Sequence, residues 1–217
     1  GREWLDKIAK QQDKPFPSAD AFRKWLDDEG FPPEIKEKML GIVPNTIKVA
    51  KDVVICLDLN TGRRIWKFET EGKPTGRKSS STAAVVDGRV YAMCSTHLYC
   101  IDQKDGKQIW KAALPGQGPG SSPLVADGRV YVAAGRAAAF SAADGKMLWE
   151  QKDVRGDIAS PTLWTPSSGK AVLVINASSN LAGLDPESGK VLWTVEGGGQ
   201  STPISSGDWL VVYSGAK

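Results

Sequence analysis

The chain has 217 residues, with 28 Lys and Arg residues against 25 Asp and Glu residues and a formal net charge of +3. Basic and acidic residues are distributed along the sequence without a long run of either sign, so we expect no nucleic acid among its partners. No apolar stretch approaches the roughly 20 residues of a membrane-spanning helix, so we expect no transmembrane segment.

Residues 1–48 carry the sequence signals of short helices. Apolar residues recur at helical spacing near the N-terminus, and the charges between them are of mixed sign, which is typical of a solvated outer face. Ser18 is the predicted N-cap of a second helix that ends at Gly30, and Pro33 begins a third that ends at Gly41. We therefore predict a small helical segment here.

From residue 49 onward, one sequence motif recurs at intervals of roughly 40 residues, and each copy of the motif ends with a Trp. A small polar residue followed by Gly precedes the Trp in every copy, with apolar residues on both sides. Because Gly accepts the positive φ of a tight turn, each copy of the motif predicts a β-hairpin. The copies read CLDLNTGRRIW, CIDQKDGKQIW, AFSAADGKMLW and GLDPESGKVLW; their Trp residues are Trp66, Trp110, Trp149 and Trp193, and their Gly residues are Gly62, Gly106, Gly145 and Gly189.

A second hairpin is predicted upstream of the motif. In the first two complete copies its turns are Asp87-Gly88 and Asp127-Gly128. A looser turn over 166–170 replaces it in the third copy. Each unit therefore holds four short antiparallel strands, which is the blade of an all-β propeller. Complete blades are expected over 79–115, 120–153 and 159–196. Each unit opens on a small polar pair: Ser80-Ser81, Ser121-Ser122, Ala159-Ser160 and Ser201-Thr202.

The repeat register leaves a partial blade at each end of the propeller region, 49–217. The first copy begins at what should be a third strand, and the last copy stops after its second strand. We favour a fragment of a larger propeller. The alternative is a closed four-bladed ring in which the two partial blades complete each other. Because residues 1–48 precede a third strand, we expect them to be an insertion in a blade loop.

This pattern resembles the PQQ-like (pyrroloquinoline quinone repeat) β-propeller family, whose repeat runs roughly A-x-D-x-x-T-G-x-x-x-W. The resemblance covers residues 53–214, and it implies that the Trp row docks each blade onto its neighbour. A WD40 propeller has a similar period, but this chain contains no Trp-Asp dipeptide, so we reject that fold.

Polar residues before or within the innermost strands are the candidates for lining the central channel of the propeller. Quinone-dependent dehydrogenases of this family hold PQQ and calcium there, beside a vicinal Cys pair that this chain lacks. PQQ with calcium is therefore a possible cofactor, but we assign neither a catalytic residue nor a metal ligand. The channel candidates are Arg77, Ser81, Gln117, Ser122, Asp157, Trp164 and Gln200.

Cys94, His97 and Cys100 form the tightest cluster of side chains that can bind a metal. Side chains alternate between the faces of a strand, and three ligands are too few for a structural zinc site. We therefore favour Cys100 as a small core residue and His97 as part of a hairpin tip. A disulfide between Cys94 and Cys100, and a metal site, remain open as alternatives.

The resemblance favours a non-catalytic binding or assembly scaffold, like the envelope lipoproteins that assist outer-membrane protein assembly. It implies a periplasmic or envelope location in a bacterium, and a protein partner or small ligand at the propeller face. The alternative is a segment of a PQQ-dependent alcohol or sugar dehydrogenase.

Overall fold

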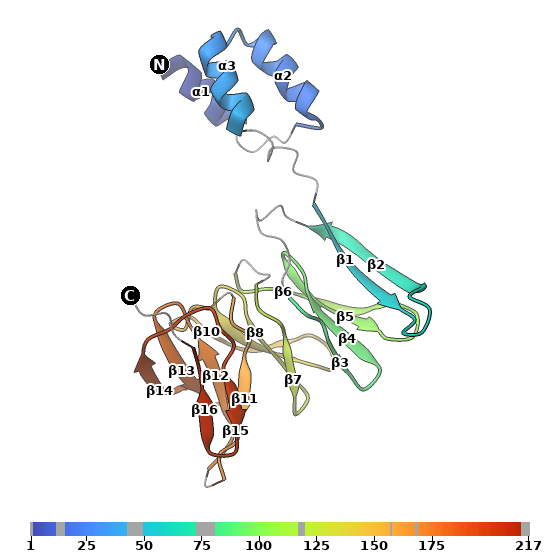
Figure 1. The fold of residues 1–217 in the computed structure, drawn as a ribbon, viewed down its shortest axis with the longest axis vertical. Coiled ribbons are helices and arrows are strands. Elements are labelled where there is room, and N and C mark those ends of the chain that lie inside the picture. Colours follow the sequence, from blue (N-terminus) through green and yellow to red (C-terminus); the bar gives the residue numbers. More distant parts are fainter. Residues whose placement is uncertain are drawn as a thin grey trace. The chain divides into compact units, whose positions relative to one another are not determined.

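In the computed structural model, the chain folds as two compact units, residues 1–50 and 51–217 (Figure 1). None of the described helices is long and apolar enough to cross a membrane. The structure describes residues 2–11, 16–42, 50–72, 81–116, 120–156, 158–167 and 169–213.

The first unit contains the three helices that the sequence predicts. Ser18 is the N-cap of the second helix, and its Oγ accepts a hydrogen bond from the backbone N–H of Ala21 at 3.0 Å. The third helix runs through Gly41 and ends one residue later than predicted. A small aromatic core, with Phe22, Leu26 and Phe31 buried, holds the unit together. The helices are α1 (Arg2–Gln11), α2 (Ala19–Asp28) and α3 (Pro33–Ile42).

The second unit consists of antiparallel sheets built from consecutive strands. Among the described residues, three sheets have four strands each, in the order in which the strands occur along the chain. We call them blades 1, 2 and 3. Blade 1 comprises β3 (Ala84–Val86), β4 (Arg89–Met93), β5 (His97–Asp102) and β6 (Gln108–Ala113). Blade 2 comprises β7 (Leu124–Ala126), β8 (Arg129–Ala133), β9 (Ala137–Ser141) and β10 (Met147–Gln151). Blade 3 comprises β11 (Thr162–Trp164), β12 (Val172–Asn176), β13 (Asn180–Leu184) and β14 (Val191–Glu196).

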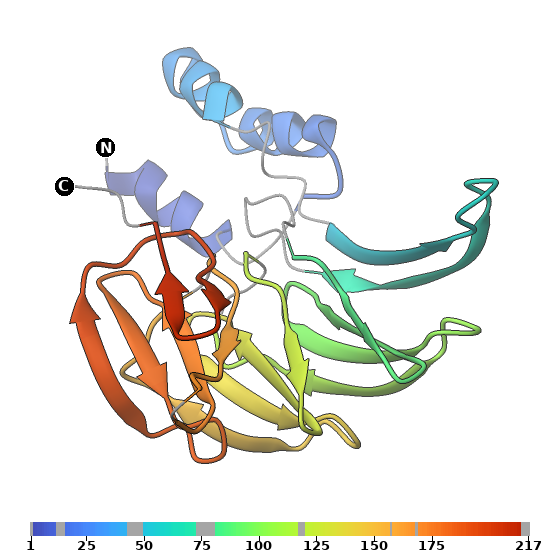
Figure 2. The ribbon, with the colours of Figure 1, turned by 60° about the horizontal axis from the view of Figure 1, so that its bottom comes forward.

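Two further sheets have two strands each and stand at the ends of the series. The N-terminal half-blade is β1 (Ala50–Leu57) with β2 (Arg64–Gly72), and the C-terminal half-blade is β15 (Ile204–Ser206) with β16 (Trp209–Val211). Figure 2 shows the five sheets fanned in an open arc, with the two half-blades at its ends. The predicted propeller arc of three complete blades and two partial ones is confirmed.

The turns follow from local chemistry. In the β3–β4 hairpin, Asp87 and Gly88 have φ values of 49° and 75°, and in the β7–β8 hairpin Asp127 and Gly128 have 48° and 69°. Two successive positive φ values match the right-handed twist of the paired strands, and Asp-Gly adopts them with little strain.

The core lies between the sheets. The second and third strands of each complete blade are buried on both faces, as the fully buried β4 and β5 interiors show. The fourth strand buries little besides its Trp. First strands of neighbouring sheets lie close together, β3 against β7 and β11 against β15, so the sheets converge at their first strands. This convergence places the segments before those strands nearest the centre of the arc.

Candidate functional site

Three of the repeated Trp residues join their own sheet to the next one along the chain. Each indole N–H donates a hydrogen bond to a backbone carbonyl of the following blade. The distances are 2.8 Å from Trp66 to Gln103, 3.1 Å from Trp110 to Ala142 and 3.0 Å from Trp149 to Pro186.

The ring of each of these Trp residues lies flat against the Gly of the next blade's turn. A Cβ placed on Gly106, Gly145 or Gly189 would come within 2.8 Å of a ring atom of the docked Trp. The same Gly residues have φ between 70° and 76°, a region that other residues rarely adopt. Both the turn and the docking therefore require Gly.

The fourth member of the Trp row has a different environment. Trp193 is half-buried, and its ring covers Gly183 of its own blade. At the other end of the arc, a Cβ placed on Gly62 would have no neighbouring heavy atom within 4 Å. Within the described residues, therefore, Trp193 has no turn Gly of a following blade to dock on, and Gly62 has no docked Trp.

A chain of small hydroxyl side chains crosses the inner ends of the sheets. The N–H of Thr82 donates to Ser122 Oγ at 2.8 Å, that of Ser122 to Ser160 Oγ at 2.8 Å, and that of Ser160 to Thr202 Oγ1 at 3.0 Å. We call these four residues the Ser/Thr ladder. The predicted first pair, Ser80-Ser81, is wrong by one residue. Thr82 stands as far before its Asp-Gly turn as Ser122 does, so the pair is Ser81-Thr82.

Removing one hydroxyl from the ladder should weaken the contact between two sheets. Ser160→Ala leaves the half-buried N–H of Ser122 without its acceptor, and we expect a loss of about 1–2 kcal/mol in the free energy of unfolding. Urea unfolding at 25 °C measures it. Ser205→Ala, on the exposed face of β15, is the matched control and should change stability by less than about 0.5 kcal/mol. Equal urea midpoints for Ser160→Ala and Ser205→Ala would show that the Ser/Thr ladder does not stabilise the contact between the sheets.

The channel candidates within the described residues lie in different environments. Ser122 belongs to the ladder, and Gln200 is exposed. Trp164 donates its indole N–H to Gly207 O at 2.9 Å, which ties blade 3 to the C-terminal half-blade. Ser81 Oγ is buried and, among the described residues, has no hydrogen-bond partner. Arg77, Gln117 and Asp157 lie outside the described residues. A cofactor role for any of the seven stays a prediction.

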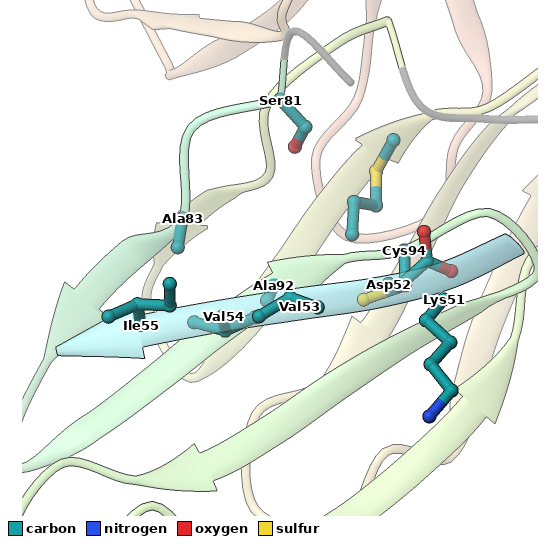
Figure 3. Close-up of a pocket in the computed structure, with 10 residues that line it drawn as sticks. Lys51, Asp52, Val53, Val54, Ile55, Ser81, Ala83, Ala92 and Cys94 are labelled. Carbon is teal, nitrogen blue, oxygen red and sulfur yellow. The ribbon is translucent and has the colours of Figure 1, made fainter. Parts of the chain in front are cut away.

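A first cleft of about 440 Å³ opens between the N-terminal half-blade and blade 1. Figure 3 shows β1 along one side of it, with Ala83, Ala92 and Cys94 of blade 1 on the other. Lys51–Ile55 of β1 and Ser81 also line it. In the complete blades the third strand pairs on both sides, whereas β1 pairs only with β2 among the described strands. One edge of β1 is therefore unpaired beside the cleft.

A carboxylate fixes the half-blade to blade 1 at one end of this cleft. Asp52 Oδ2 accepts hydrogen bonds from the N–H of Ser95 at 2.8 Å and from its hydroxyl at 2.6 Å. A Cβ on Gly72 would lie 2.9 Å from the same oxygen. Burial, with a smaller contribution from the Asp52 charge, raises the pKa of the Cys94 thiol to about 12. Cys94 therefore stays protonated at neutral pH and is a poor nucleophile.

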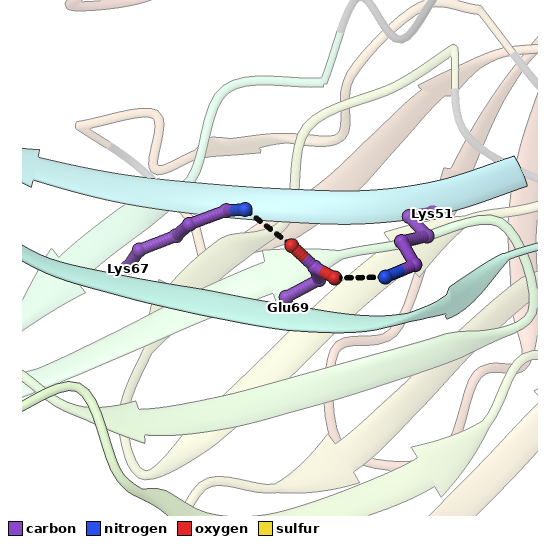
Figure 4. A network of polar contacts seen from close by, with 3 residues as sticks. All are labelled: Lys51, Lys67 and Glu69. Carbon is purple, nitrogen blue, oxygen red and sulfur yellow. Dashed lines mark hydrogen bonds and ion pairs between the residues drawn. The ribbon is translucent and has the colours of Figure 1, made fainter.

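The face of the half-blade that points away from blade 1 carries a cross-strand ion-pair network. Glu69 of β2 accepts hydrogen bonds from Lys51 of β1 and from Lys67 of its own strand (Figure 4). The bond from Lys51 is the main cause that lowers the pKa of Glu69 to about 2, followed by the bond from Lys67. All three side chains are exposed to solvent.

This network should titrate and respond to salt. Because the folded-state pKa of Glu69 lies below its ordinary value of 4.5, its ionised form favours folding. That contribution is complete above pH 4.5 and is lost as the pH falls toward 2. We expect carboxyl-carbon NMR to give a pKa for Glu69 well below 4.5 at low salt, rising toward that value in about 1 M NaCl. Lys67→Met should raise it as well. An ordinary pKa at low salt would contradict the network.

A second cleft of about 720 Å³ lies where the end of β2 meets β5 and β6. Glu71, His97 and Lys111 bring both signs of charge and an imidazole to its lining. The hydroxyls of Tyr99 and Thr70 share a hydrogen bond of 2.8 Å across it, from blade 1 to the half-blade. These groups are suited to binding polar groups of a ligand or a peptide backbone.

The structure does not bring Cys94, His97 and Cys100 together as a group that could hold a metal ion. All three cysteines of the chain are free thiols. His97 begins β5, and its Nδ1 lies 2.7 Å from Thr96 Oγ1. Cys100 is fully buried opposite Trp110, at the position that Ala139 and Gly183 occupy in the other blades. Among the described residues, no group of three or more His, Cys, Asp and Glu side chains could hold a metal ion.

Sequence reasoning did not find the Asp52–Ser95 contact or the two clefts. The two residues come from different sheets and show no fixed spacing in the repeat. The only signal was that Asp52 is an acidic residue in a strand, where Asp is depleted.

Comparison with known proteins places the fold in a family. A family model described as "Outer membrane protein assembly factor BamB" matches residues 50–214. Tetrathionate hydrolase of Acidithiobacillus ferrooxidans is 27% identical over 79% of this chain and 42% of its own length. The serine/threonine-protein kinase AfsK of Streptomyces coelicolor is 29% identical over 72% of this chain and 19% of its own length. BamB of Yersinia pestis is 26% identical over 66% of this chain and 39% of its own length.

Solved structures agree on the fold. BamB from Moraxella catarrhalis superposes with a TM-score of 0.58 and 22% identity, over 73% of this chain and 48% of that one. The computationally designed Ika8 protein superposes with a TM-score of 0.51 and 12% identity, over 72% of this chain and 48% of its own.

The chain spans less than half the length of each curated relative. Their names describe a hydrolase, a kinase and an assembly factor, so the shared blades identify the fold and not a single activity. The repeat, the confirmed sheet order and the match over residues 50–214 agree, and the chain belongs to the family of PQQ-like repeat β-propellers described as outer membrane protein assembly factor BamB.

Proposed function

We propose that the chain is part of a propeller scaffold that binds another polypeptide during assembly of cell-envelope proteins and carries out no redox chemistry. The proposal places the protein in the periplasm or at the envelope of a bacterium. The family description and the BamB relative support it.

The main support for this proposal is that three Trp residues of the repeat are covered by neighbouring blades. The rings of Trp66, Trp110 and Trp149 lie on Gly residues of neighbouring blades, and each indole N–H bonds a backbone carbonyl. A planar cofactor that stacks on an aromatic side chain requires a free face on that ring. These three rings are already covered by protein, so they serve the architecture of the propeller.

The second cleft is the surface that we assign to a polypeptide partner. Glu71 and Lys111 offer one charge of each sign, while His97 and Thr96 offer hydrogen-bonding groups between them. A peptide backbone presents donors and acceptors alternately, and its side chains can pair with both charges. A cleft with this mixed lining fits a peptide better than it fits a single anion.

One experiment separates the scaffold from a quinone enzyme. Full-length protein, purified without cofactor, is mixed with PQQ and Ca²⁺, and both quinone absorbance and dye-linked alcohol oxidation are recorded. The proposal expects no stoichiometric uptake and no turnover. Uptake of one quinone per protein with alcohol oxidation would overturn it in favour of a PQQ-dependent dehydrogenase.

A second experiment tests the partner directly. A photo-crosslinking amino acid replaces His97 in the second cleft or, as the matched control, the exposed Leu148 on β10. The client is a urea-unfolded outer-membrane β-barrel protein diluted into buffer with the full-length protein. We expect client cross-links at position 97 and few at position 148. Equal or absent cross-linking at both positions would contradict the assignment of this cleft.

A further inference from the structure

The second cleft has two basic side chains on the wall that blade 1 contributes, and that wall carries no acid to balance them. We propose that this cleft selects an acidic side chain of the bound polypeptide, an Asp or a Glu, and that Lys111 and His97 hold its carboxylate. The inference rests on the proposed function, because it names the chemistry by which the cleft recognises its polypeptide partner.

The repeat shows how blade 2 fills the same position. Counted from the repeated Trp of each blade, Glu150 stands where Lys111 does, and Arg136 stands where His97 does. In blade 2 these two side chains form an ion pair, with 2.6 Å between Arg136 Nη1 and Glu150 Oε1. Blade 2 therefore carries its own carboxylate at this point, whereas blade 1 carries a second base.

Lys111 is left without a carboxylate. It is exposed on the face of blade 1 that points toward the N-terminal half-blade, opposite the buried Tyr99. Among the described residues Lys111 forms no ion pair, and Glu71, the acid that lines the cleft, lies beyond ion-pair distance of it. A carboxylate from the partner can take the place that Glu150 has in blade 2.

His97 offers a second donor on the same wall. Its ring is half-buried, and its Nδ1 lies 2.7 Å from Thr96 Oγ1, while Nε2 has no hydrogen-bond partner among the described residues. When the Thr96 hydroxyl donates to Nδ1, the neutral ring carries its proton on Nε2, and Nε2 can donate to a carboxylate oxygen. A protonated ring donates from both nitrogens, so Nε2 is a donor in that form as well.

Two hydroxyls that bridge the cleft leave a third donor. Tyr99 OH and Thr70 Oγ1 lie 2.8 Å apart and share one hydrogen bond, which uses one of their two hydroxyl hydrogens. The other hydrogen has no further acceptor among the described residues, so it can bond a ligand oxygen in the cleft. An ammonium, an imidazole N–H and a hydroxyl together match an ionised carboxylate, which only accepts hydrogen bonds.

The opposite wall comes from an extension of the half-blade. β2 runs to Gly72, six residues past Trp66, whereas β6 ends at Ala113, three residues past Trp110. Residues 70–72 of β2 line the cleft, and β6 offers no strand of that length to blade 2. With its volume of about 720 Å³, the cleft has room for a short stretch of chain around the acidic side chain.

Photo-cross-linking inside the cleft tests the selection. In the full-length protein a photo-reactive amino acid replaces Ala113, which lines the cleft, and leaves His97 and Lys111 in place. The probes are two ten-residue peptides of Ser and Thr, acetylated and amidated at their ends, with a central Glu or a central Gln. We expect the Glu peptide to cross-link about five times as strongly at low salt, and the two yields to become equal in about 1 M NaCl.

A charge reversal tests the role of Lys111. Lys111→Glu copies the acid that blade 2 has at this position, and it should favour a third peptide, with a central Lys, over the Glu peptide. Lys107→Glu is the matched control, because it changes the net charge equally at a side chain that is 82% exposed and outside the cleft lining. It should keep the preference for Glu, and both variants should keep the circular dichroism of the parent. A preference for Glu that survives Lys111→Glu would overturn the assignment to this residue.

Failure of this inference is distinguishable from failure of the proposed function. Equal capture of the Glu and Gln peptides at low salt, or capture of neither, would overturn the selection of an acid, while client cross-links at position 97 would still support a polypeptide-binding cleft. Equal peptide yields together with absent client cross-links would contradict both. Stronger capture of a Gln peptide with a free C-terminal carboxylate than of the amidated Glu peptide would overturn the inference in favour of a chain terminus.

Discussion

Trp149→Ala is expected to lower the free energy of unfolding of the propeller unit by about 3–5 kcal/mol. Only 9% of Trp149 is exposed, and it packs with Leu173 and Leu184 of the next blade. Its indole N–H also bonds Pro186 O at 3.0 Å. The substitution removes the largest apolar side chain between blades 2 and 3 and leaves a cavity there. Urea unfolding at 25 °C gives the change, and the melting temperature should fall by on the order of 10 °C.

Trp149→Phe separates the packing of the ring from its hydrogen bond. Phe keeps most of the buried apolar area, but it leaves the carbonyl of Pro186 without its donor, so we expect a loss of about 1–2 kcal/mol. The Ala variant should therefore be clearly less stable than the Phe variant. A melting temperature unchanged by Trp149→Ala would show that the ring does not hold the two blades together.

The repeat made most of the propeller predictable because its signals are local. Asp87-Gly88 and Asp127-Gly128 adopt the paired positive φ values that a two-residue hairpin needs, and short apolar strands flank them. The same logic located both half-blades, because the register of the repeat shows which strands are present. Hairpins depend on neighbours in sequence, and these are readable without a structure.

Contacts between blades were harder to predict. Several hydroxyl residues stand in a row before β3, and the sequence alone did not show which of them bonds the next blade. Thr82 is selected by its distance from the Asp-Gly turn, and the prediction chose the residue before it. Asp52 bonds Ser95 of another sheet, a pairing that depends on how the sheets stack. Such contacts are long-range and carry no periodic signal.

The lining of the central channel is the part that sequence reasoning reaches least. Whether a polar residue before a first strand points to the axis depends on the angle between successive blades and on their number. Both follow from contacts such as the Trp149–Gly189 docking, in which a ring from one blade fits a turn of another. A pattern of polar residues therefore gives candidates such as Ser122 and Gln200, while their geometry comes from packing.

Gly189→Ala isolates the docking contact from the backbone of the turn. Gly189 has φ +70°, and a Cβ there would lie 2.5 Å from Cε3 of Trp149. The left-handed φ costs about 1–2 kcal/mol for Ala, and overpacking adds about 1–3 kcal/mol. We expect a total loss of roughly 2–5 kcal/mol in urea unfolding.

Gly128→Ala is the matched control because Gly128 has φ +69° and open space where its Cβ would lie. It should lose only the conformational part, about 1–2 kcal/mol. Combining Gly189→Ala with Trp149→Ala should cost less than the sum of the two single losses, since the clash disappears with the ring. Equal losses at both Gly positions, or strict additivity of the pair, would mean that the turn alone demands Gly189. A larger loss at Gly189 that shrinks when the ring is removed would show that the docked Trp sets this requirement.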